Sequence, residues 1–445
     1  MKVIDLIPAA GSPGSLATTA FHGALLAGLS MIDVEARAIG LPLYPADWTP
    51  SVLGDVESRA PWLPPTPYRF GDRADAAERG IFERDNCAGD DRAPRWRLEL
   101  LLERELLAFA QREERVVVFV DTRSYPVMRS ALRCARRLGW KTVAFSNEAL
   151  TDLQIDPKDR DDYIRCVTGC ADGVWTVSEH LAAYWTEHGV PSERLFLQPS
   201  VVRASSFDEK PSPTGTSRTA YVGNLAHQEV RYLIEIASLV RAAIPEFKLS
   251  IFGDATAETR DGLKRMVADR DLSDVVFVEP PVVPAEVPSV LAQADVLLLP
   301  RSRGEFSDAG FPNKLGEYLA SGRPVVVTRV GDIPLYLVDS ESAFLVEPDD
   351  VDGFAAAVVR ALRSPLLGAE VGLRGSEVAR QTLRADAVAR RLVAFTDSLP
   401  VQTVAEPIRT SRQWMRMLSA LPDPALLRRD ASLLARSLDP RRRTR

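Results

Sequence analysis

Cysteine and histidine are both scarce in this sequence, with four of each among 445 residues. The cysteines are Cys87, Cys134, Cys166 and Cys170; they include no C-x-x-C pair, and no histidine cluster accompanies them. Structural zinc sites are built from such pairs and clusters, so the sequence predicts no metal site. This cysteine usage fits a reducing compartment, and we expect a cytoplasmic protein.

Long apolar runs and an excess of positive charge are missing as well. No run of about 18 apolar residues occurs, which argues against a membrane-spanning helix. The first residues, MKVIDLIPAAGSPG, are typical of a strand and a turn and not of a signal peptide. The net charge of -6 argues against a protein that coats nucleic acid, so we expect no nucleic-acid partner.

The charge is unevenly distributed along the chain. Residues 408–445 contain ten Arg and three Asp but no Lys or Glu, a net charge of +7, which leaves -13 for the first 407 residues. Apolar residues are interspersed with these arginines. Two interpretations stay open: a basic amphipathic surface that contacts anionic lipid on the inner face of a membrane, or a packed helix with a solvated basic end.

What the sequence does contain is enough apolar material, 46% of its residues, for two domains of about 200 residues each. Short runs rich in Val and Ile alternate with amphipathic stretches of helical period, a pattern that predicts βαβ units around parallel sheets. The expected strands are residues 3–8, 32–39, 116–120, 142–146, 173–177 and 195–198 in the first half, and 219–225, 248–252, 275–278, 296–300, 324–328 and 343–346 in the second.

A change of composition divides the chain into domains. Residues 203–217, RASSFDEKPSPTGTS, are rich in Pro, Ser, Gly and Thr and predict a linker between residues 1–202 and 218–380. We expect residues 381–445 to form C-terminal helices and the basic tail, packing back on the first domain. Residues 41–95 show little periodicity and form either a functional loop or a poorly ordered segment. The carboxyl edges of two doubly wound domains that face each other make a natural cleft.

The most informative stretch is residues 294–326, ADVLLLPRSRGEFSDAGFPNKLGEYLASGRPVV. It predicts a buried strand, a loop that contains glycine, and a helix that begins near Phe311. The N–H groups at such a helix start, beside Gly310 and one turn from Lys314, can hold a diphosphate. Glu317, three residues beyond Lys314, can accept hydrogen bonds from a ribose diol. By physics alone, an ordinary Rossmann-like helix with a surface Lys and Glu stays open as the alternative.

This stretch resembles the nucleotide-sugar signature of the family 4 (group 1) glycosyltransferases, in which two Glu separated by seven residues precede an A-x-G-x-P-V-V turn. Glu317 matches the second Glu, and residues 320–326, ASGRPVV, match the turn. YVGNL at residues 221–225 and IFGDA at 251–255 resemble strands of the family's donor domain, and the match covers most of residues 174–362. The resemblance implies an α/β protein of the GT-B fold, with two Rossmann-like doubly wound parallel-sheet domains facing a central cleft. The first domain would be the acceptor side and the second the donor side.

The sequence departs from this family at several positions. Ala309 stands where the family has its first Glu, whose carboxylate usually meets the donor sugar, and Asp308 or Glu305 are candidates to replace it. Asn224 and Glu229 stand where Arg and Lys are common. Arg231 is the nearest cation, and Arg301 and Arg303 in the loop after the fourth strand can also neutralise a leaving diphosphate.

The first domain supplies further candidates. Gly11 and Gly14 lie in the loop after the first strand, where either an ordinary turn or a donor contact is expected. Asn147 and Glu148 follow a strand where the family often has a His, and Asp121 and Arg123 end another strand. The predicted donor-binding residues are Gly11, Gly14, Gly223, Arg231, Ala309, Gly310, Phe311, Lys314 and Glu317, and the predicted catalytic residues are Asp308, Asn147 and Glu148.

The resemblance implies transfer of a sugar from a nucleoside-diphosphate sugar, with UDP- or GDP-sugars expected, with retention at the anomeric carbon and without a metal or other cofactor. The acceptor would be a glycan, a lipid-linked molecule or a small molecule. Two alternatives stay open: an inactive GT-B-like protein that binds a nucleotide or a partner, and a sugar-nucleotide epimerase of similar shape.

Overall fold

A computed structural model describes residues 1–8, 15–41, 115–122, 125–148, 159–208, 215–225, 229–283 and 286–400. Several residues discussed above lie outside these ranges: Gly11, Gly14, Cys87, Arg123, most of the 41–95 segment and the basic tail. Among the described residues, no helix combines the length and the apolar character that a membrane crossing requires.

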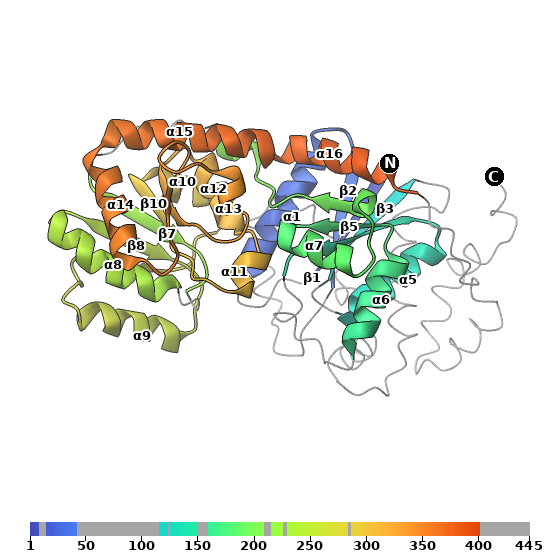
Figure 1. The fold of residues 1–445 in the computed structure, drawn as a ribbon, viewed down its shortest axis with the longest axis horizontal. Coiled ribbons are helices and arrows are strands. Elements are labelled where there is room, and N and C mark those ends of the chain that lie inside the picture. Colours follow the sequence, from blue (N-terminus) through green and yellow to red (C-terminus); the bar gives the residue numbers. More distant parts are fainter. Residues whose placement is uncertain are drawn as a thin grey trace, which may run out of the picture.

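The first sheet has six parallel strands in the order β2-β1-β3-β4-β5-β6 (Figure 1). The order places the first strand inside the sheet, as in a doubly wound domain. Its strands are β1 (Lys2–Pro8), β2 (Glu35–Leu41), β3 (Val116–Asp121), β4 (Lys141–Ser146), β5 (Gly173–Thr176) and β6 (Leu195–Leu197), and its described helices are α1 (Ser15–Ser30), α5 (Tyr125–Arg137), α6 (Arg160–Cys170) and α7 (Glu179–Glu187).

The second sheet repeats this plan with the order β12-β11-β10-β7-β8-β9, again all parallel. Its strands are β7 (Arg218–Val222), β8 (Lys248–Phe252), β9 (Val276–Glu279), β10 (Val296–Leu299), β11 (Val325–Thr328) and β12 (Phe344–Val346). Its helices are α8 (Glu229–Ala243), α9 (Ala257–Ala268), α10 (Val287–Ala292), α11 (Glu305–Ala309), α12 (Asn313–Ala320), α13 (Ile333–Tyr336) and α14 (Val351–Arg363).

The two sheets confirm the predicted fold class. All twelve expected strands are present, most of them within two residues of the predicted bounds. Strands such as β3, β10 and β11 are buried along their whole length, because helices cover both faces of a doubly wound sheet. The segment before α12 was expected to be a loop, but it contains the short helix α11. Gly304, with a φ of 147°, directly precedes this helix, and Glu305 lies in its first turn. A carboxylate in the first turn favours a helix start.

The chain returns from the second domain to the first through α15 (Pro365–Thr382) and α16 (Ala385–Ser398), which run end to end along one side of the molecule (Figure 1). α15 packs on α12, and α16 packs on α1. The Ala385 N–H donates to the carbonyl of Val202 (2.8 Å), and the Val202 N–H donates to the carbonyl of Leu383 (2.8 Å). The two passages of the chain between the domains are therefore bonded to each other.

The contact between α1 and α16 depends on a glycine. A Cβ added to Gly28 would lie 2.3 Å from the carbonyl oxygen of Ala385, a distance that real Cβ atoms do not show. At the far end of α16, Lys141 Nζ donates to the carbonyls of Thr396 (2.7 Å) and Leu399 (2.9 Å). A cation at a helix C-terminus stabilises the helix through its exposed carbonyls.

We expect Gly28→Ala to lower the free energy of unfolding by about 1–3 kcal/mol, because the added methyl group must separate α1 from α16. Urea unfolding followed by far-UV circular dichroism measures this loss. Gly169→Ala in α6 is the matched control: a Cβ there meets nothing within 4 Å. The control should be neutral or stabilising by up to about 1 kcal/mol, since alanine favours a helix over glycine. Equal effects of the two substitutions would contradict the close contact.

Candidate functional site

The candidate site lies at the carboxyl edge of the second sheet, at the point where the strand order reverses. β7 and β10 are neighbours, but the chain leaves β7 toward β8 on one side and reaches β10 on the other. In doubly wound sheets, ligands bind outside the carboxyl ends of the strands at such a switch point. Gly223 directly follows β7, and Arg301 follows β10 by two residues.

Four polar side chains meet at this edge: two cations, one carboxylate and one tyrosine hydroxyl. Lys314 Nζ, from the first turn of α12, donates to the hydroxyl of Tyr221 on β7 (2.7 Å). The same nitrogen lies 3.7 Å from Glu229 Oε2, at the start of α8, and Arg301 Nε lies 3.8 Å from Glu229 Oε1. The Arg301 and Glu229 side chains are 5% and 8% exposed, so these charges are largely removed from water. Interactions between charges are stronger in such surroundings than at an exposed surface.

Burial lowers the pKa values of the two basic groups in this cluster. Burial lowers the pKa of Lys314 to about 8, although the Glu229 carboxylate acts in the opposite direction. The guanidinium of Arg301 also has a lowered pKa, again because burial disfavours its charge. Burial therefore disfavours the charged forms of both groups, and an additional anion would favour them.

The helix α12 is held against β7 by a tyrosine. The Val222 N–H donates to the Tyr318 hydroxyl (2.6 Å), and that hydroxyl donates to the Val222 carbonyl (3.2 Å). Pro312 is the N-cap residue of α12 and supplies no side-chain hydrogen bond to the helix. Gly223 makes room for the lysine, because a Cβ at this position would lie 2.7 Å from Lys314 Nζ. The N-terminus of α12 and its lysine are thus fixed at the switch point.

Glu317 lies one turn after Lys314 on the same helix and is partly buried. Burial raises the pKa of its carboxyl to about 7, while the positive charges of Arg203 and Lys314 act to lower it. Arg203 comes from the segment that leaves the first domain, and burial lowers the pKa of its guanidinium to about 10, against the attraction of Glu317. The carboxylate that was predicted to contact ribose therefore faces a cation supplied by the interdomain segment.

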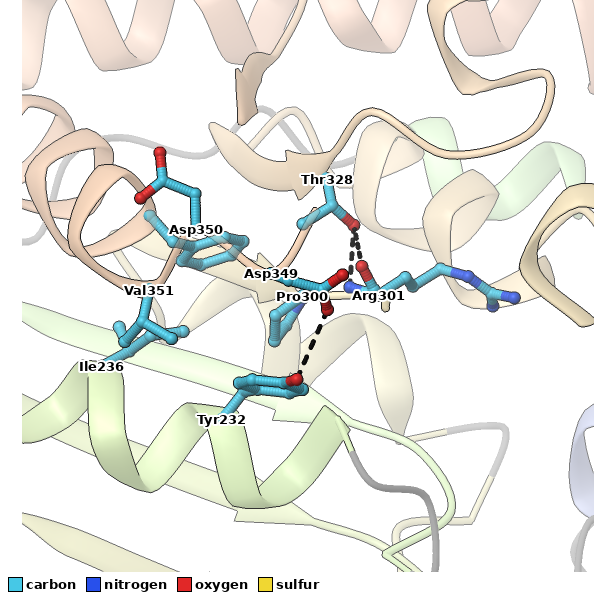
Figure 2. Close-up of a pocket in the computed structure, with 9 residues that line it drawn as sticks. Tyr232, Ile236, Pro300, Arg301, Thr328, Asp349, Asp350 and Val351 are labelled. Carbon is cyan, nitrogen blue, oxygen red and sulfur yellow. Dashed lines mark hydrogen bonds between the residues drawn. The ribbon is translucent and has the colours of Figure 1, made fainter. Parts of the chain in front are cut away.

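A pocket opens next to the cluster, between α8 and the start of α14 (Figure 2). The Tyr232 hydroxyl donates to Asp349 Oδ1 across it (3.3 Å), and the Thr328 hydroxyl bonds the backbone N–H and carbonyl of Arg301 (2.8 Å each). Figure 2 shows the Arg301 guanidinium directed away from Tyr232 and Asp349. Arg301 therefore contributes backbone to this pocket and its charge to the cluster with Glu229.

Contacts between the domains close the region around Ala309. The Ser178 hydroxyl, at the N-cap of α7 in the first domain, donates to the Ala309 carbonyl (2.6 Å), and the side chain of Ala309 is fully buried. Asp332 of the second domain accepts from the Glu179 N–H (2.7 Å), also at the start of α7. The place where the family has its first Glu is consequently occupied by a packed interface.

The structure brings some of the predicted donor-binding residues together and separates others. Gly223 lies directly beside Lys314, where a Cβ would collide with the lysine, and Glu317 lies on the same helix as Lys314. Arg231 is exposed on α8, and Arg303 is exposed and pairs with Glu347 (3.6 Å). Of the three arginines considered from the sequence, Arg301 is the one that faces Lys314 across a shared carboxylate.

The remaining predicted residues lie on α11, just before α12, or after β4 in the first domain. Asp308 is exposed on α11, Gly310 is the C-cap residue of that helix, and Phe311 is buried edge-to-face against Tyr336 (5.6 Å between ring centroids). Asn147 and Glu148 are partly buried directly after β4. Across the described parts of the chain, no group of three or more His, Cys, Asp or Glu side chains is placed to hold a metal ion.

Three residues of the site escaped the sequence-based prediction. Tyr221 was noted only as part of a strand, Glu229 only as a departure from the family, and Arg203 only as the first residue of the linker. Glu229 could have been found as the first acidic residue after a predicted strand-to-helix loop. Nothing in the local sequence of Arg203 connects it with Glu317, more than a hundred residues away.

Comparisons with known proteins bear on the family resemblance and on the fold. Residues 216–364 match the family model described as Glycosyl transferases group 1. The D-inositol 3-phosphate glycosyltransferase of Pseudarthrobacter chlorophenolicus is 25% identical over 221 residues, which cover 47% of this chain and 51% of that protein. The GDP-mannose-dependent alpha-(1-6)-phosphatidylinositol monomannoside mannosyltransferase of Mycolicibacterium smegmatis is 28% identical over 48% of this chain and 58% of the relative. The chain thus spans about half the length of these curated relatives.

Solved structures extend the likeness to most of the chain. TarM of S. aureus, in a complex with UDP, superposes with a TM-score of 0.66 at 11% identity and covers 89% of this chain and 100% of the other. HepE of Anabaena, in complex with UDP, has a TM-score of 0.64 at 14% identity, with 90% and 100% covered. At these identities the likeness concerns the fold. The predicted GT-B fold and the resemblance to the group 1 glycosyltransferases are both confirmed.

We expect Glu317→Gln to change the free energy of unfolding, and this change should be about 1–3 kcal/mol more stabilising at pH 8 than at pH 5. The folded-state pKa of this carboxyl is raised to about 7, so its contribution to stability is present below about pH 4.5 and is lost as the pH rises through 7. Urea unfolding at pH 5, 6, 7 and 8 measures the difference. Glu377→Gln on α15, whose side chain is 58% exposed, is the control and should show no such trend. A difference that does not grow with pH would contradict the shifted pKa.

We expect Ala309→Glu to lower the free energy of unfolding by about 3–5 kcal/mol, because the new carboxylate enters a fully buried position beside α7. Ala183→Glu on the exposed side of α7 is the matched control and should stay within about 0.5 kcal/mol of the parent protein. Thermal unfolding with calorimetric detection measures both. If Ala309→Glu is as well tolerated as the control, the family carboxylate has room in this chain and the packed interface is contradicted.

Proposed function

We propose that this protein, whose residues 216–364 match the group 1 glycosyltransferase model, transfers a sugar from a nucleoside-diphosphate sugar to an acceptor held by the first domain. The observation that carries the proposal is the placement of Lys314 and Arg301 on either side of Glu229 at the switch point, with Glu317 one turn further along α12. Two cations and a helix start suit a diphosphate, and a carboxylate at this distance suits a ribose diol.

The donor is assigned to UDP- or GDP-sugars. HepE was solved in complex with UDP-glucose, and one curated relative is named as GDP-mannose-dependent, so both bases occur among proteins that this chain resembles. In our proposal Lys314 and Arg301 hold the phosphates, and Gly223 leaves space beside them. Glu317 accepts hydrogen bonds from the ribose hydroxyls, and the positive charge of Arg203 favours its ionised form against the effect of burial.

The proposed reaction proceeds with retention and without a metal. As the bond between the anomeric carbon and the diphosphate breaks, negative charge accumulates on the leaving oxygen. Lys314, Arg301 and the start of α12 stabilise this charge from fixed positions, which is the largest contribution that such a site can make. In our proposal the acceptor hydroxyl attacks on the face that the diphosphate leaves. Its oxygen bonds to the anomeric carbon as the bond to the diphosphate breaks, and its proton passes to the departing diphosphate oxygen. Asn147, Glu148 and Asp308 are the proposed groups on the acceptor side.

The acceptor is a glycan, a lipid-linked molecule or a small molecule. The first domain presents the carboxyl edge of its sheet toward the second domain through the contacts of Ser178 and Glu179. A peripheral contact with a membrane through the basic residues 408–445 is part of this proposal for a lipid-linked acceptor.

A second candidate function is nucleotide binding without sugar transfer. The supporting observation is Ala309, which is buried and whose carbonyl is held by Ser178, so the position lacks a carboxylate to meet the donor sugar. The two functions share the phosphate and ribose contacts and differ only in turnover of the sugar.

We expect one or two of UDP, GDP, ADP, TDP and CDP to raise the melting temperature, and Glu317→Ala to remove the shift. A ligand at about 100 times its dissociation constant stabilises the native state by about 2.7 kcal/mol. Affinity should be highest between about pH 7 and pH 8, where Glu317 has lost its proton and Lys314 keeps its own. Isothermal titration calorimetry from pH 6 to pH 9 measures this optimum.

Release of the free nucleotide from the matching nucleotide-sugar, followed over a panel of glycan and lipid acceptors, then separates the two functions. Binding with release supports the transferase, and binding without any release supports the second candidate. A folded protein that responds to no nucleotide would contradict both.

A further inference from the structure

Glu229 is an anion placed where the proposed function puts a phosphate. It is the first residue of α8, and its carboxylate lies between Arg301 Nε (3.8 Å) and Lys314 Nζ (3.7 Å). The positive end of the α8 dipole and the two cations all favour a negative charge at this point. The three side chains together carry a net charge of +1, whereas the two cations alone would carry +2.

The geometry of this contact is incomplete. Within the described residues, Glu229 Oε2 and Arg301 Nε are both buried and have no hydrogen-bond partner. Distances of 3.7 and 3.8 Å are too long for the charge-assisted hydrogen bonds that such groups form at about 2.7–2.9 Å. Buried polar atoms in folded proteins are almost always bonded, so an unbonded pair between opposite charges calls for an explanation. A ligand with several acceptor oxygens would provide the partner that Arg301 Nε lacks.

A purely structural ion pair would look different. A carboxylate that served only to anchor Arg301 would be expected to receive its N–H groups directly, as Tyr221 receives Lys314 at 2.7 Å. Glu229 instead lies 3.7 Å from Lys314 Nζ and 3.8 Å from Arg301 Nε, so that its carboxylate is shared between the two cations at long range. It offsets their repulsion, while Arg301 Nη2 donates to the Phe306 carbonyl and the Ser307 hydroxyl (3.4 Å each), Lys314 donates to Tyr221, and of these three nitrogens Arg301 Nε alone is left without a hydrogen-bond partner among the described residues.

We propose that Glu229 is an internal counter-anion that occupies the proposed phosphate position and weakens diphosphate binding there. This proposal rests on the proposed function for the identity of the natural ligand, and it deepens that function by naming a residue that sets donor affinity. A phosphate that enters must share Arg301 and Lys314 with the carboxylate or displace it. The same repulsion speeds departure of the nucleoside diphosphate after the sugar has moved.

The test compares binding of inorganic pyrophosphate to the full-length protein and to its Glu229→Gln variant by isothermal titration calorimetry. We choose pH 6.5, because removal of the Glu229 charge lowers the pKa of Lys314 further and the lysine must remain protonated. Glutamine keeps the shape of the side chain and removes its charge. We expect Glu229→Gln to bind pyrophosphate at least about tenfold more tightly, a change of about 1.4 kcal/mol.

Two controls make the result specific. Glu235→Gln, further along α8, removes an acidic side chain that is 45% exposed and should leave the affinity unchanged. Lys314→Met in the Glu229→Gln background should abolish the gain, which a general change in net charge would not predict. Glu229→Ala should reproduce the tighter binding if the glutamine variant folds poorly.

Equal or weaker pyrophosphate binding by folded Glu229→Gln and Glu229→Ala would overturn the proposal and assign Glu229 a positioning role for the two cations. The proposed function is tested separately by the nucleotides. Tighter pyrophosphate binding in a protein that binds no nucleoside diphosphate would support the counter-anion and contradict the glycosyltransferase.

Discussion

The attraction between Glu229 and the two cations Lys314 and Arg301 is the interaction on which the rest of the site depends. Each of the three groups lies at the start of a helix or just beyond the end of a strand at the switch point of the second sheet. Their mutual attraction allows buried charges in a place that would otherwise exclude them, since unpaired ions are costly to bury. It also leaves cations that are only partly satisfied. In our proposal a further anion binds to these cations, and Glu229 limits how strongly it is held.

The second domain does not form this site alone. Arg203 reaches Glu317 from the segment that leaves the first domain, and Ser178 and Glu179 of the first domain hold the loops that carry Ala309 and Asp332. The charge of the predicted ribose contact and the position of the α11 loop therefore both depend on how the two domains meet. Closure of two domains around a donor is a common way to exclude water from a transfer reaction. In this chain the charge of Arg203, from the segment between the domains, also acts on the pKa of Glu317, the proposed ribose contact.

Much of the fold could be predicted from the sequence, because parallel strands covered on both faces are continuous apolar runs, and twelve such runs are separated by helical periods. Lys314 and Glu317 could be predicted as well, since the signature places them one turn apart at the start of a helix. The choice among the arginines could not. Arg231, Arg301 and Arg303 look equivalent along the chain, and only burial distinguishes Arg301 from the two exposed residues. The short helix α11 was also missed, because five residues carry too little periodicity to recognise.

The sequence by itself determined the fold class of the protein, which is two doubly wound domains, and a helix start with a lysine and a glutamate in the second. These features are local, because they follow from periodicity and from spacing within one turn or one βαβ unit. The tertiary structure decided which charges share a site and in what state. Glu229 meets Arg301, and Arg203 meets Glu317, across 72 and 114 positions of chain, through packing that no local pattern encodes. The protonation of Lys314 and Glu317 and the packing around Ala309 are set by such long-range contacts, since the energy of a charge depends on its burial and its neighbours.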